Sequence, residues 1–362
     1  MRSIKAAVCH DFNAPLRVEQ VHLRPPGAGE VEVTLEAVAI CHSDISYAEG
    51  AWGGDLPAVY GHEAAGRITA IGPGVTGWAE GQRVIVTLIR SCGGCASCAS
   101  GAPVYCRDAP ALAPPLTTAT GGALKQGLAC GAFAEAVVVQ PSQLAAVPDD
   151  MPAEQACLLA CGVVTGLGAA VHTAAVRPGE VVVVIGAGGV GLNAIQGARL
   201  AGASRIIAVD MSADKLEAAR AFGATDGVLA GDAKPWRAAR DAAGGRAADV
   251  VLVTVGAIPA YQVAMRYLAP RGRMVMVGMP HSGEVASYEP VVVAAQGQAM
   301  VGSLMGEVVL GRDIPWMVDL WRQGRLELAG LISGRWALEH INEAIADTRA
   351  GHARRNVILM DG

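Results

Sequence analysis

The sequence has few aromatic residues, little charge and no cluster of basic residues. Aromatic residues make up 4% of the 362 positions, charged residues make up 17%, and the formal net charge is −5. The adjacent arginines Arg354 and Arg355 form an isolated basic pair. Because contacts with nucleic-acid phosphates need a clustered positive surface, we expect no nucleic-acid partner.

No stretch has the pattern of a secretory signal or an uninterrupted membrane span. The first residues, MRSIKAAVCHDF, lack the apolar core of a signal peptide. Residues 155–176 and 181–198 carry no full charge, but several glycines and polar residues interrupt both. An apolar strand, turn and helix explain these stretches better than a span does. We therefore expect a cytoplasmic protein with no membrane partner.

Cysteine is absent from the last two hundred or so residues. All nine cysteines lie between Cys9 and Cys161. A secreted disulfide scaffold would be small and evenly cross-linked, and this chain is neither. The placement favours metal binding.

The length predicts about two domains, and the first third of the chain is typical of a β-rich one. Residues 30–37 alternate polar and apolar side chains, which predicts a half-buried strand. Further short strands are expected at 66–71, 83–86 and 133–139. Residues 109–120, rich in Pro, Ala and Thr, are expected to form a loop.

From about residue 163 the pattern changes to apolar strands that alternate with helices. A continuous apolar run at 181–185 is followed by glycines and a helical pattern to residue 201, and Ser212 is expected to cap the next helix. Such alternation predicts an α/β domain, in which a doubly wound parallel sheet is covered on both faces. The other expected elements are strands at 205–209, 249–253, 273–277 and 357–360, and a helix at 314–323.

The run GAGGVG at residues 186–191 directly follows a predicted strand and begins a helix. In such a turn Gly186 permits the tight bend, Gly188 lets the backbone approach a pyrophosphate, and Gly191 allows close packing. Asp210 ends the next strand, where a carboxylate binds ribose hydroxyls. Since that charge repels a 2′-phosphate, we expect NAD rather than NADP. Lys215 either reaches the same ribose or is an ordinary exposed lysine.

Four cysteines, Cys92, Cys95, Cys98 and Cys106, lie within 15 residues of one another. Four thiolates complete a tetrahedral coordination, which leaves no position for a substrate, so we expect a structural zinc. Disulfides are disfavoured by the expected compartment. The spacing alone does not exclude an iron–sulfur cluster.

Three further candidate ligands, Cys41, His62 and Cys161, are far apart in the sequence. Taken singly, each is more simply read as a packed core residue. Their neighbours favour a site, because Cys41 follows a predicted strand and His62 lies in an ionisable cluster within a Gly-rich segment. Cys161 begins the helical segment that leads into the second domain.

Taken together, these motifs closely resemble the zinc-containing alcohol dehydrogenases of the medium-chain dehydrogenase/reductase family, over essentially the whole chain. The motifs that carry the resemblance are CHSD at 41–44, GHEAAG at 61–66, the glycines at 72, 74, 77 and 81, the four-cysteine segment, CGVVTG at 161–166, GAGGVG at 186–191 and RNVI at 355–358.

The resemblance implies a role for each residue near the expected catalytic zinc. Cys41, His62 and Cys161 would ligate it, which is the Cys₂His set known for alcohol dehydrogenase. The family pattern makes Asp44 the carboxylate that orients His62, Glu63 an acidic residue behind the metal, and Ser43 the hydroxyl that accepts the alcohol proton.

The resemblance also implies contacts with the cofactor. His42 and Arg355 match positions that contact the pyrophosphate, and Thr165 and Val190 match positions packed near the nicotinamide. Gly189 completes the glycine turn. Hydride would pass from a primary or secondary alcohol to NAD, giving an aldehyde or ketone.

The family's architecture implies an irregular, β-rich, GroES-like catalytic domain at 1–162 and 304–362, with the structural-zinc lobe at 88–110. A Rossmann domain at 163–303 would bind NAD, and the catalytic zinc and nicotinamide would meet between the domains. Relatives pair through the strand that corresponds to 299–303, so a homodimer or homotetramer is expected.

The sequence departs from the family pattern at two places. Ser46 replaces the histidine that completes a proton relay in many relatives, and Cys106 is not followed by the arginine of relatives that oxidise the glutathione adduct of formaldehyde. Trp52, Leu88 and Met279 predict a mostly apolar substrate, although plain packing explains them nearly as well. Two alternatives stay open: a family dehydrogenase acting on polyols or activated carbonyls, and a non-catalytic zinc- and NAD-binding protein.

Overall fold

The computed structural model describes residues 1–111, 113–351 and 353–360, and the chain forms two compact units. Unit 1 comprises Met1–Cys161, Val309–Gly324 and Leu328–Gly362, and unit 2 comprises Gly162–Val308 and Arg325–Glu327. The expected division was at 162/163 and 303/304. The chain passes from unit 1 to unit 2 immediately after Cys161.

Five strands of unit 1 form a closed barrel in the order β1-β2-β7-β8-β4. The core of unit 1 includes Ile4, Ala6 and Val8 from one face of β1, and also Ala7 and Cys9 near the end of this strand. The barrel strands are β1 (Arg2–Cys9), β2 (Arg17–Leu23), β4 (Ala58–Val59), β7 (Leu116–Thr118) and β8 (Ala123–Gln126).

A second, seven-stranded sheet of unit 1 has the order β10-β6-β5-β3-β18-β17, with β9 also paired to β3. The alternation at 30–37 correctly predicts β3, which lies in the middle of this sheet. Its strands are β3 (Val31–Ala39), β5 (Glu63–Ile71), β6 (Arg83–Thr87), β9 (Ala136–Val139), β10 (Leu144–Ala146), β17 (Ile332–Ala337) and β18 (Arg355–Leu359).

The prediction that residues 109–120 form only a loop is wrong. Residues Leu116–Thr118 form β7, which pairs with β2 through contacts such as Leu23 with Leu116 and Val21 with Thr118. This pairing joins segments about a hundred residues apart, so the local composition does not reveal it.

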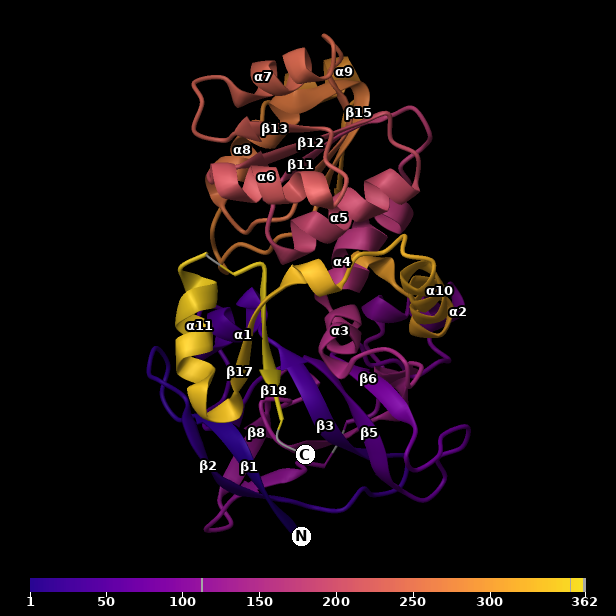
Figure 1. Cartoon of the computed structure of the whole chain (residues 1–362), viewed down its shortest axis with the longest axis vertical. Coiled ribbons are helices and arrows are strands. Elements are labelled where there is room, and N and C mark those ends of the chain that lie inside the picture. Colours follow the sequence, from indigo (N-terminus) through magenta and orange to yellow (C-terminus); the bar gives the residue numbers. More distant parts are fainter. Residues whose placement is uncertain (112, 352, 361–362) are drawn as a thin grey trace. The chain divides into compact units, whose positions relative to one another are not determined.

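Short helices connect the strands of unit 1. The α-helices are α1 (His42–Ala48), α2 (Ala96–Ala99), α3 (Ala153–Ala156), α10 (Leu310–Arg322) and α11 (Ile341–Arg349). The 3₁₀ turns are η1 (Pro103–Tyr105), η2 (Gly127–Ala129), η3 (Pro141–Gln143), η4 (Cys157–Ala160), η8 (Ala329–Leu331) and η9 (Leu338–His340). Figure 1 shows α11 beside β17 and β18, which it contacts.

Unit 2 contains the predicted doubly wound parallel sheet. Its strands have the order β13-β12-β11-β14-β15-β16 and are all parallel. Numbered along the chain, this is the order 3-2-1-4-5-6 of dinucleotide-binding sheets. The strands are β11 (Val181–Ile185), β12 (Arg205–Asp210), β13 (Asp226–Leu229), β14 (Ala248–Val253), β15 (Leu268–Met276) and β16 (Ala299–Gly302).

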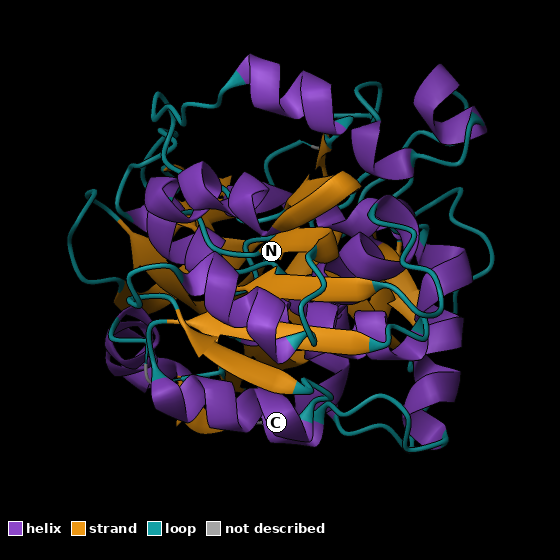
Figure 2. Ribbon diagram, turned by 90° about the horizontal axis from the view of Figure 1, so that it is seen from above, coloured by secondary structure: helices purple, strands orange, loops and turns teal. Residues whose placement is uncertain are grey.

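Helices cover both faces of this sheet, as Figures 1 and 2 show. Val181, Val183 and Ile185 pack with residues of α7 and α8, whereas α5 contacts β11 and β12. Ser212 caps α6 as predicted, since its hydroxyl accepts the Lys215 N–H at 3.4 Å. The helices are α4 (Gly162–Gly168), α5 (Gly189–Leu200), α6 (Ala213–Ala221), α7 (Pro235–Ala242), α8 (Ile258–Ala264) and α9 (Pro290–Gln296), with the π-helix η5 (Ala169–Thr173) and the 3₁₀ turns η6 (Met265–Tyr267) and η7 (Met305–Glu307).

No single helix among the described residues is long and apolar enough to span a membrane. One bent pair, Ala153–Ala160 followed by Gly162–Thr173, meets the length and composition criteria when taken together.

Candidate active site and metal centres

Four side chains from three separate segments of unit 1 converge in its interior. The ligand atoms of Cys41, His62, Glu63 and Cys161 all lie within 4.8 Å of one another. Cys41 and Cys161 are 7% and 6% exposed, and His62 and Glu63 are fully buried. The structure therefore brings together the three ligands expected for a catalytic zinc, with a carboxylate beside them.

Strand pairing explains how distant residues meet. Ala39 at the end of β3 pairs with Glu63 at the start of β5, so Cys41 and His62 lie just beyond the ends of neighbouring strands. Cys41 is the N-cap residue of α1. Cys161 lies at the break between η4 and α4, and η4 contacts both β3 and β5.

Asp44 holds two of the candidate ligands in place. Its Oδ1 lies 2.8 Å from His62 Nδ1 and accepts the Gly61 N–H at 2.9 Å, and its Oδ2 accepts the Cys41 N–H at 3.1 Å. With Nδ1 directed to the carboxylate, the other ring nitrogen of His62 is the one left to bind a metal. That Nε2 is buried and has no hydrogen-bond partner among the described residues. The geometry is that of a carboxylate–histidine–metal arrangement.

The charges around these ligands favour binding of a cation. Burial opposes protonation of His62, but Asp44 and Cys41 together outweigh this effect and raise the pKa of His62 well above its usual value. A hydrogen bond between the two thiols lowers the pKa of Cys41 and raises that of Cys161. A zinc ion bound here would displace the protons of these thiols and of the imidazole, and would balance the charge of the thiolates.

Glu63 and Arg355 form a buried pair next to the ligands. Arg355 Nη2 lies 3.4 Å from Glu63 Oε1, and its Nη1 donates to the Ile40 carbonyl at 3.3 Å. Burial raises the pKa of Glu63 to about 8, and the guanidinium opposes this shift. Arg355 is 5% exposed in unit 1. Its contact with Glu63 was not anticipated from the sequence, and its contact with a pyrophosphate stays a prediction.

The remaining residues of the CHSD motif lie in the first turn of α1. His42 is exposed, and Ser43, two residues after Cys41, is half-buried. Ser46, at the place of the family's relay histidine, is also half-buried. The first turn of α1 therefore carries an exposed imidazole and a half-buried hydroxyl directly after the buried Cys41.

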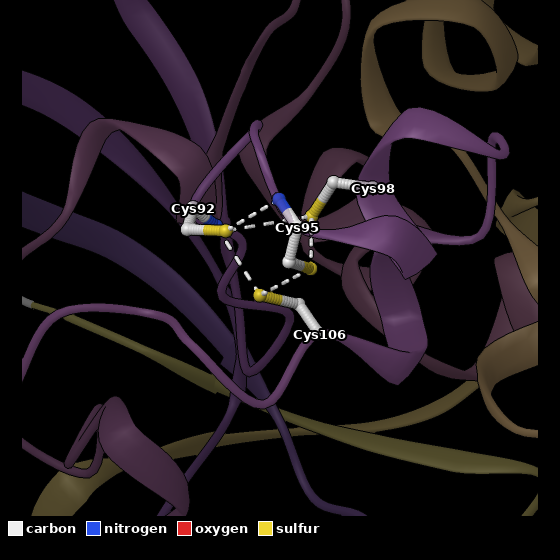
Figure 3. A group of neighbouring side chains, drawn as sticks. All are labelled: Cys92, Cys95, Cys98 and Cys106. Atoms are coloured by element: carbon white, nitrogen blue, oxygen red, sulfur yellow. Dashed lines mark hydrogen bonds between the residues drawn. The ribbon is translucent and has the colours of Figure 1, made fainter.

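The four-cysteine segment forms the second candidate metal centre (Figure 3). The sulfur atom of Cys95 lies 3.5 Å from that of Cys98 and 3.8 Å from that of Cys106, and the Cys92 and Cys98 sulfurs are 4.0 Å apart. With Zn–S bonds of about 2.3 Å, the edge of a tetrahedron of sulfurs is about 3.8 Å. An iron–sulfur cluster would spread its four ligands around a larger core. The separations fit a single ion.

Backbone groups support this tetrahedron of sulfurs. The N–H of Cys95 donates to the Cys92 sulfur and the N–H of Cys92 donates to the Cys106 sulfur, each at 3.3 Å. Hydrogen bonds from backbone N–H groups, those of Gly94 and Cys95, lower the pKa of Cys92 to about 7. All nine cysteines of the chain are free thiols. The lobe therefore presents four free sulfur ligands rather than disulfides.

The glycine turn of unit 2 has the geometry that dinucleotide binding needs. Gly186 has a φ of +98°, and a Cβ at Gly191 would lie 1.8 Å from the Gly186 oxygen. A Cβ at Gly188 would meet no atom within 4 Å, and α5 begins here without a side-chain cap. The backbone at Gly188 is thus open to the approach of a pyrophosphate at the positive end of α5.

The other expected cofactor residues lie around this turn. Asp210 ends β12, and its Oδ2 accepts the Ala187 N–H at 2.8 Å. Lys215 is half-buried in α6. A Cβ at Gly166 would lie 2.2 Å from the Val190 oxygen, so α4, which carries Thr165, packs closely against the start of α5. Gly189 is the first residue of α5.

The three residues expected to line the substrate pocket lie in both units. In unit 1, Trp52 contacts the Tyr47 ring edge-on with centroids 5.1 Å apart, and Leu88 packs half-buried against the core. In unit 2, Met279 is 59% exposed. Their contact with a substrate stays a prediction.

Two contacts at the candidate sites are not predicted by the sequence. One is the Glu63–Arg355 pair, and the other is a hydrogen bond from Thr254 to the glycine turn. Neither has a local signal, because each joins residues far apart in the chain. For the second contact, the position of Thr254 directly after a strand of the parallel sheet is the one feature of the sequence that could have indicated it.

Protein-family models match two parts of the chain. Residues 27–149 match the family described as alcohol dehydrogenase GroES-like domain, and residues 189–323 match the family described as zinc-binding dehydrogenase. The first match includes Cys41, His62 and the four-cysteine lobe, and the second begins at Gly189, within the glycine turn.

Similar proteins extend over the full length. The NDMA-dependent alcohol dehydrogenase of Amycolatopsis methanolica is 34% identical, over 98% of each chain. A zinc-binding domain protein of the alcohol dehydrogenase type from Burkholderia ambifaria has a TM-score of 0.95 and 34% identity, and benzyl alcohol dehydrogenase from Acinetobacter calcoaceticus has 0.93 and 29%; both cover 100% of each chain. The chain therefore belongs to the zinc-containing medium-chain dehydrogenase/reductase family. Within that family it is an oxidoreductase of the alcohol dehydrogenase type.

Proposed function

We propose that this protein is a zinc-dependent, NAD-linked alcohol dehydrogenase that interconverts a primary or secondary alcohol with its aldehyde or ketone. The observation that carries the proposal is the buried set of Cys41, His62 and Cys161, with their ligand atoms within 4.8 Å and His62 oriented by Asp44. Three protein ligands leave one position of a tetrahedral zinc for a substrate, whereas the four cysteines of the lobe leave none.

The roles of the residues follow from their places. Zinc held by Cys41, His62 and Cys161 would polarise the alcohol oxygen as a Lewis acid. Ser43 would take the alcohol proton, because its half-buried hydroxyl lies in the first turn of α1, between the exposed His42 and the buried Asp44. Asp44 keeps the ring of His62 and the backbone of Cys41 in one orientation throughout. NAD would accept the hydride.

The preference for NAD over NADP rests on Asp210. Its carboxylate is held at the end of β12 by the N–H groups of Ala187 and Ser212, at 2.8 and 3.0 Å. A fixed negative charge at this position favours ribose hydroxyls and repels a 2′-phosphate. Lys215 is the nearby cation that would reduce this discrimination.

A spectrophotometric assay tests the proposal. Purified protein is mixed with NAD or NADP and a panel of primary, secondary and aromatic alcohols, with polyols added for the family alternative. Aromatic alcohols are included because one similar structure is a benzyl alcohol dehydrogenase, and NDMA is included as an oxidant because one relative depends on it. Chelator-sensitive absorbance at 340 nm with NAD is the expected result. No turnover with any oxidant, in protein that contains zinc, would favour the non-catalytic alternative.

We also propose that the protein forms homodimers through the edge of the unit 2 sheet. β16 is the last strand of that sheet and pairs with β15 alone among the described strands. Met300, Val301 and Leu304 are 41%, 38% and 38% exposed there. A free, apolar strand edge favours pairing with a second copy. Light scattering should give a dimer or tetramer for the native chain and a smaller species for Val301→Lys.

A further inference from the structure

A threonine outside every predicted site touches the glycine turn. Thr254 directly follows β14, and Val253 of that strand pairs with Ile185, the last residue of β11. The backbone N–H of Thr254 donates to the Ile185 carbonyl at 2.9 Å. This pairing places the Thr254 side chain beside Gly186, the first residue of the turn.

The Thr254 hydroxyl holds the carbonyl of Gly186. Its Oγ1 lies 2.9 Å from the Gly186 oxygen and 3.0 Å from the Ile185 oxygen, so its single proton is shared between two acceptors. A Cβ on residue 186 would lie 2.9 Å from this hydroxyl and 2.4 Å from Val255 Cγ1. Thr254 and Val255 are therefore part of the reason that glycine is needed here.

The same peptide group is held at its other end by Asp210. The Gly186 carbonyl and the Ala187 N–H belong to one planar peptide, and Asp210 Oδ2 accepts that N–H at 2.8 Å. The two side chains come from β14 and β12, the strands on either side of β11. Because the peptide is rigid, contacts at both ends determine its orientation, and with it the direction of the N–H groups that follow.

We propose that Thr254 is a positioning residue for dinucleotide binding, which clamps the 186–187 peptide against Asp210. This inference rests on the proposed function, since it assumes that the turn binds NAD(H). The clamp orients the start of α5 for the pyrophosphate and, through Asp210, fixes the carboxylate for the ribose. Binding to a turn that is already ordered avoids the cost of ordering it.

The test is a fluorescence titration of NADH into the full-length protein and its variants. Thr254→Val removes the hydroxyl, and Thr254→Ala is a second removal, since the added methyl of valine would face two carbonyl oxygens. Loss of one hydrogen bond predicts a Kd for NADH about five- to tenfold higher. Thr254→Ser keeps the hydroxyl and should restore the Kd to within about twofold of the native value.

Thr225→Val is the matched control. The Thr225 hydroxyl also has two acceptors, the Ile206 carbonyl at 3.1 Å and Asp226 Oδ2 at 2.7 Å. Thr225 precedes β13 and so lies toward the opposite end of the strands. A general loss of sheet stability would affect both valine variants alike, whereas the clamp predicts that only Thr254→Val weakens NADH binding.

A double-mutant cycle with Asp210→Asn measures the coupling itself. If the two side chains hold one peptide, the fold increase in Kd of the double variant should be well below the product of the fold increases of the two single variants. The clamp would be overturned by fold increases in Kd that multiply exactly, by an unchanged Kd in Thr254→Val and Thr254→Ala, or by an equal loss of NADH affinity in Thr225→Val. In each of these cases, NADH binding by the native protein would still uphold the proposed function. A native protein that binds neither NADH nor NADPH would overturn both.

Discussion

The two cysteine-rich centres of unit 1 are built in opposite ways. The lobe takes four ligands from one short segment, in which Cys92 is exposed and the others are half-buried. The buried cluster takes Cys41, His62 and Cys161 from three distant segments of the sequence. A local loop can surround an ion completely, whereas a site built at strand ends can leave one coordination position open and surround it with oriented partners. The first design suits stability and the second suits chemistry.

The largest expected effect comes from removing a ligand of the buried cluster. His62→Ala or Cys161→Ser should lower kcat/KM by roughly 10³-fold or more, because the Lewis acid that supplies several kcal/mol of polarisation is lost. Zinc content should fall from about two ions per chain to about one. Turnover assays with zinc analysis check this. Full activity with unchanged zinc would remove the distinction between the two centres.

The next effect comes from the carboxylate that orients His62. Asp44→Asn replaces one of its acceptor oxygens by an NH₂ group, and zinc affinity at this centre should fall by about 10- to 100-fold. Competition with a chromophoric chelator measures it. Asp313→Asn is the control, since Asp313 is another buried aspartate of unit 1, one that pairs with Arg312. Equal losses in both variants would mean that a buried aspartate matters here only for folding.

A ligand of the lobe should affect stability rather than chemistry. Cys98→Ser should remove one zinc and lower the melting temperature by about 5–10 °C, because a structural metal contributes directly to folding. Activity at 25 °C, per folded molecule, should stay within about twofold of the native value, since the lobe offers no open coordination position. Thermal melts and assays on the same sample measure both. A large loss of turnover without loss of stability would contradict this division.

The smallest effect is expected at an ion pair that takes no part in either candidate metal centre. Glu30 binds Arg24 Nη2 at 2.7 Å and accepts the Gly27 N–H at 2.6 Å, and the hydrogen bond from Arg24 lowers the pKa of Glu30. A carboxyl whose folded pKa is lowered stabilises the protein above its unfolded pKa, about 4.3, and loses this contribution as the pH falls through the folded value.

Glu30→Gln should therefore lower the melting temperature by about 2–6 °C at pH 7. The difference from the native protein should shrink below about pH 4 and should not depend on chelator. Melting curves between pH 7 and pH 3, with and without chelator, measure this. A difference that grew on acidification would show that Glu30 is not the ionised partner of Arg24.

Much of the fold could be predicted from short sequence patterns. The alternation at 30–37 predicts β3, the apolar run at 181–185 predicts β11, and Ser212 predicts the start of α6. The strand β7 could not be predicted, because residues 116–118 form it only by pairing with β2. Pairing partners far apart in the chain leave no periodicity in either segment.

The candidate sites show the same difference between local patterns and contacts between distant residues. The spacing of Cys92, Cys95, Cys98 and Cys106 and the run GAGGVG are local, so the sequence by itself determined the lobe and the glycine turn. Convergence of Cys41, His62 and Cys161 was expected only from the family resemblance, and the tertiary structure decided it through the pairing of β3 with β5. The structure alone revealed that Arg355 lies against Glu63 and that Thr254 holds Gly186. A local loop brings its ligands together by chain geometry, whereas contacts between strand ends exist only once the sheet has formed.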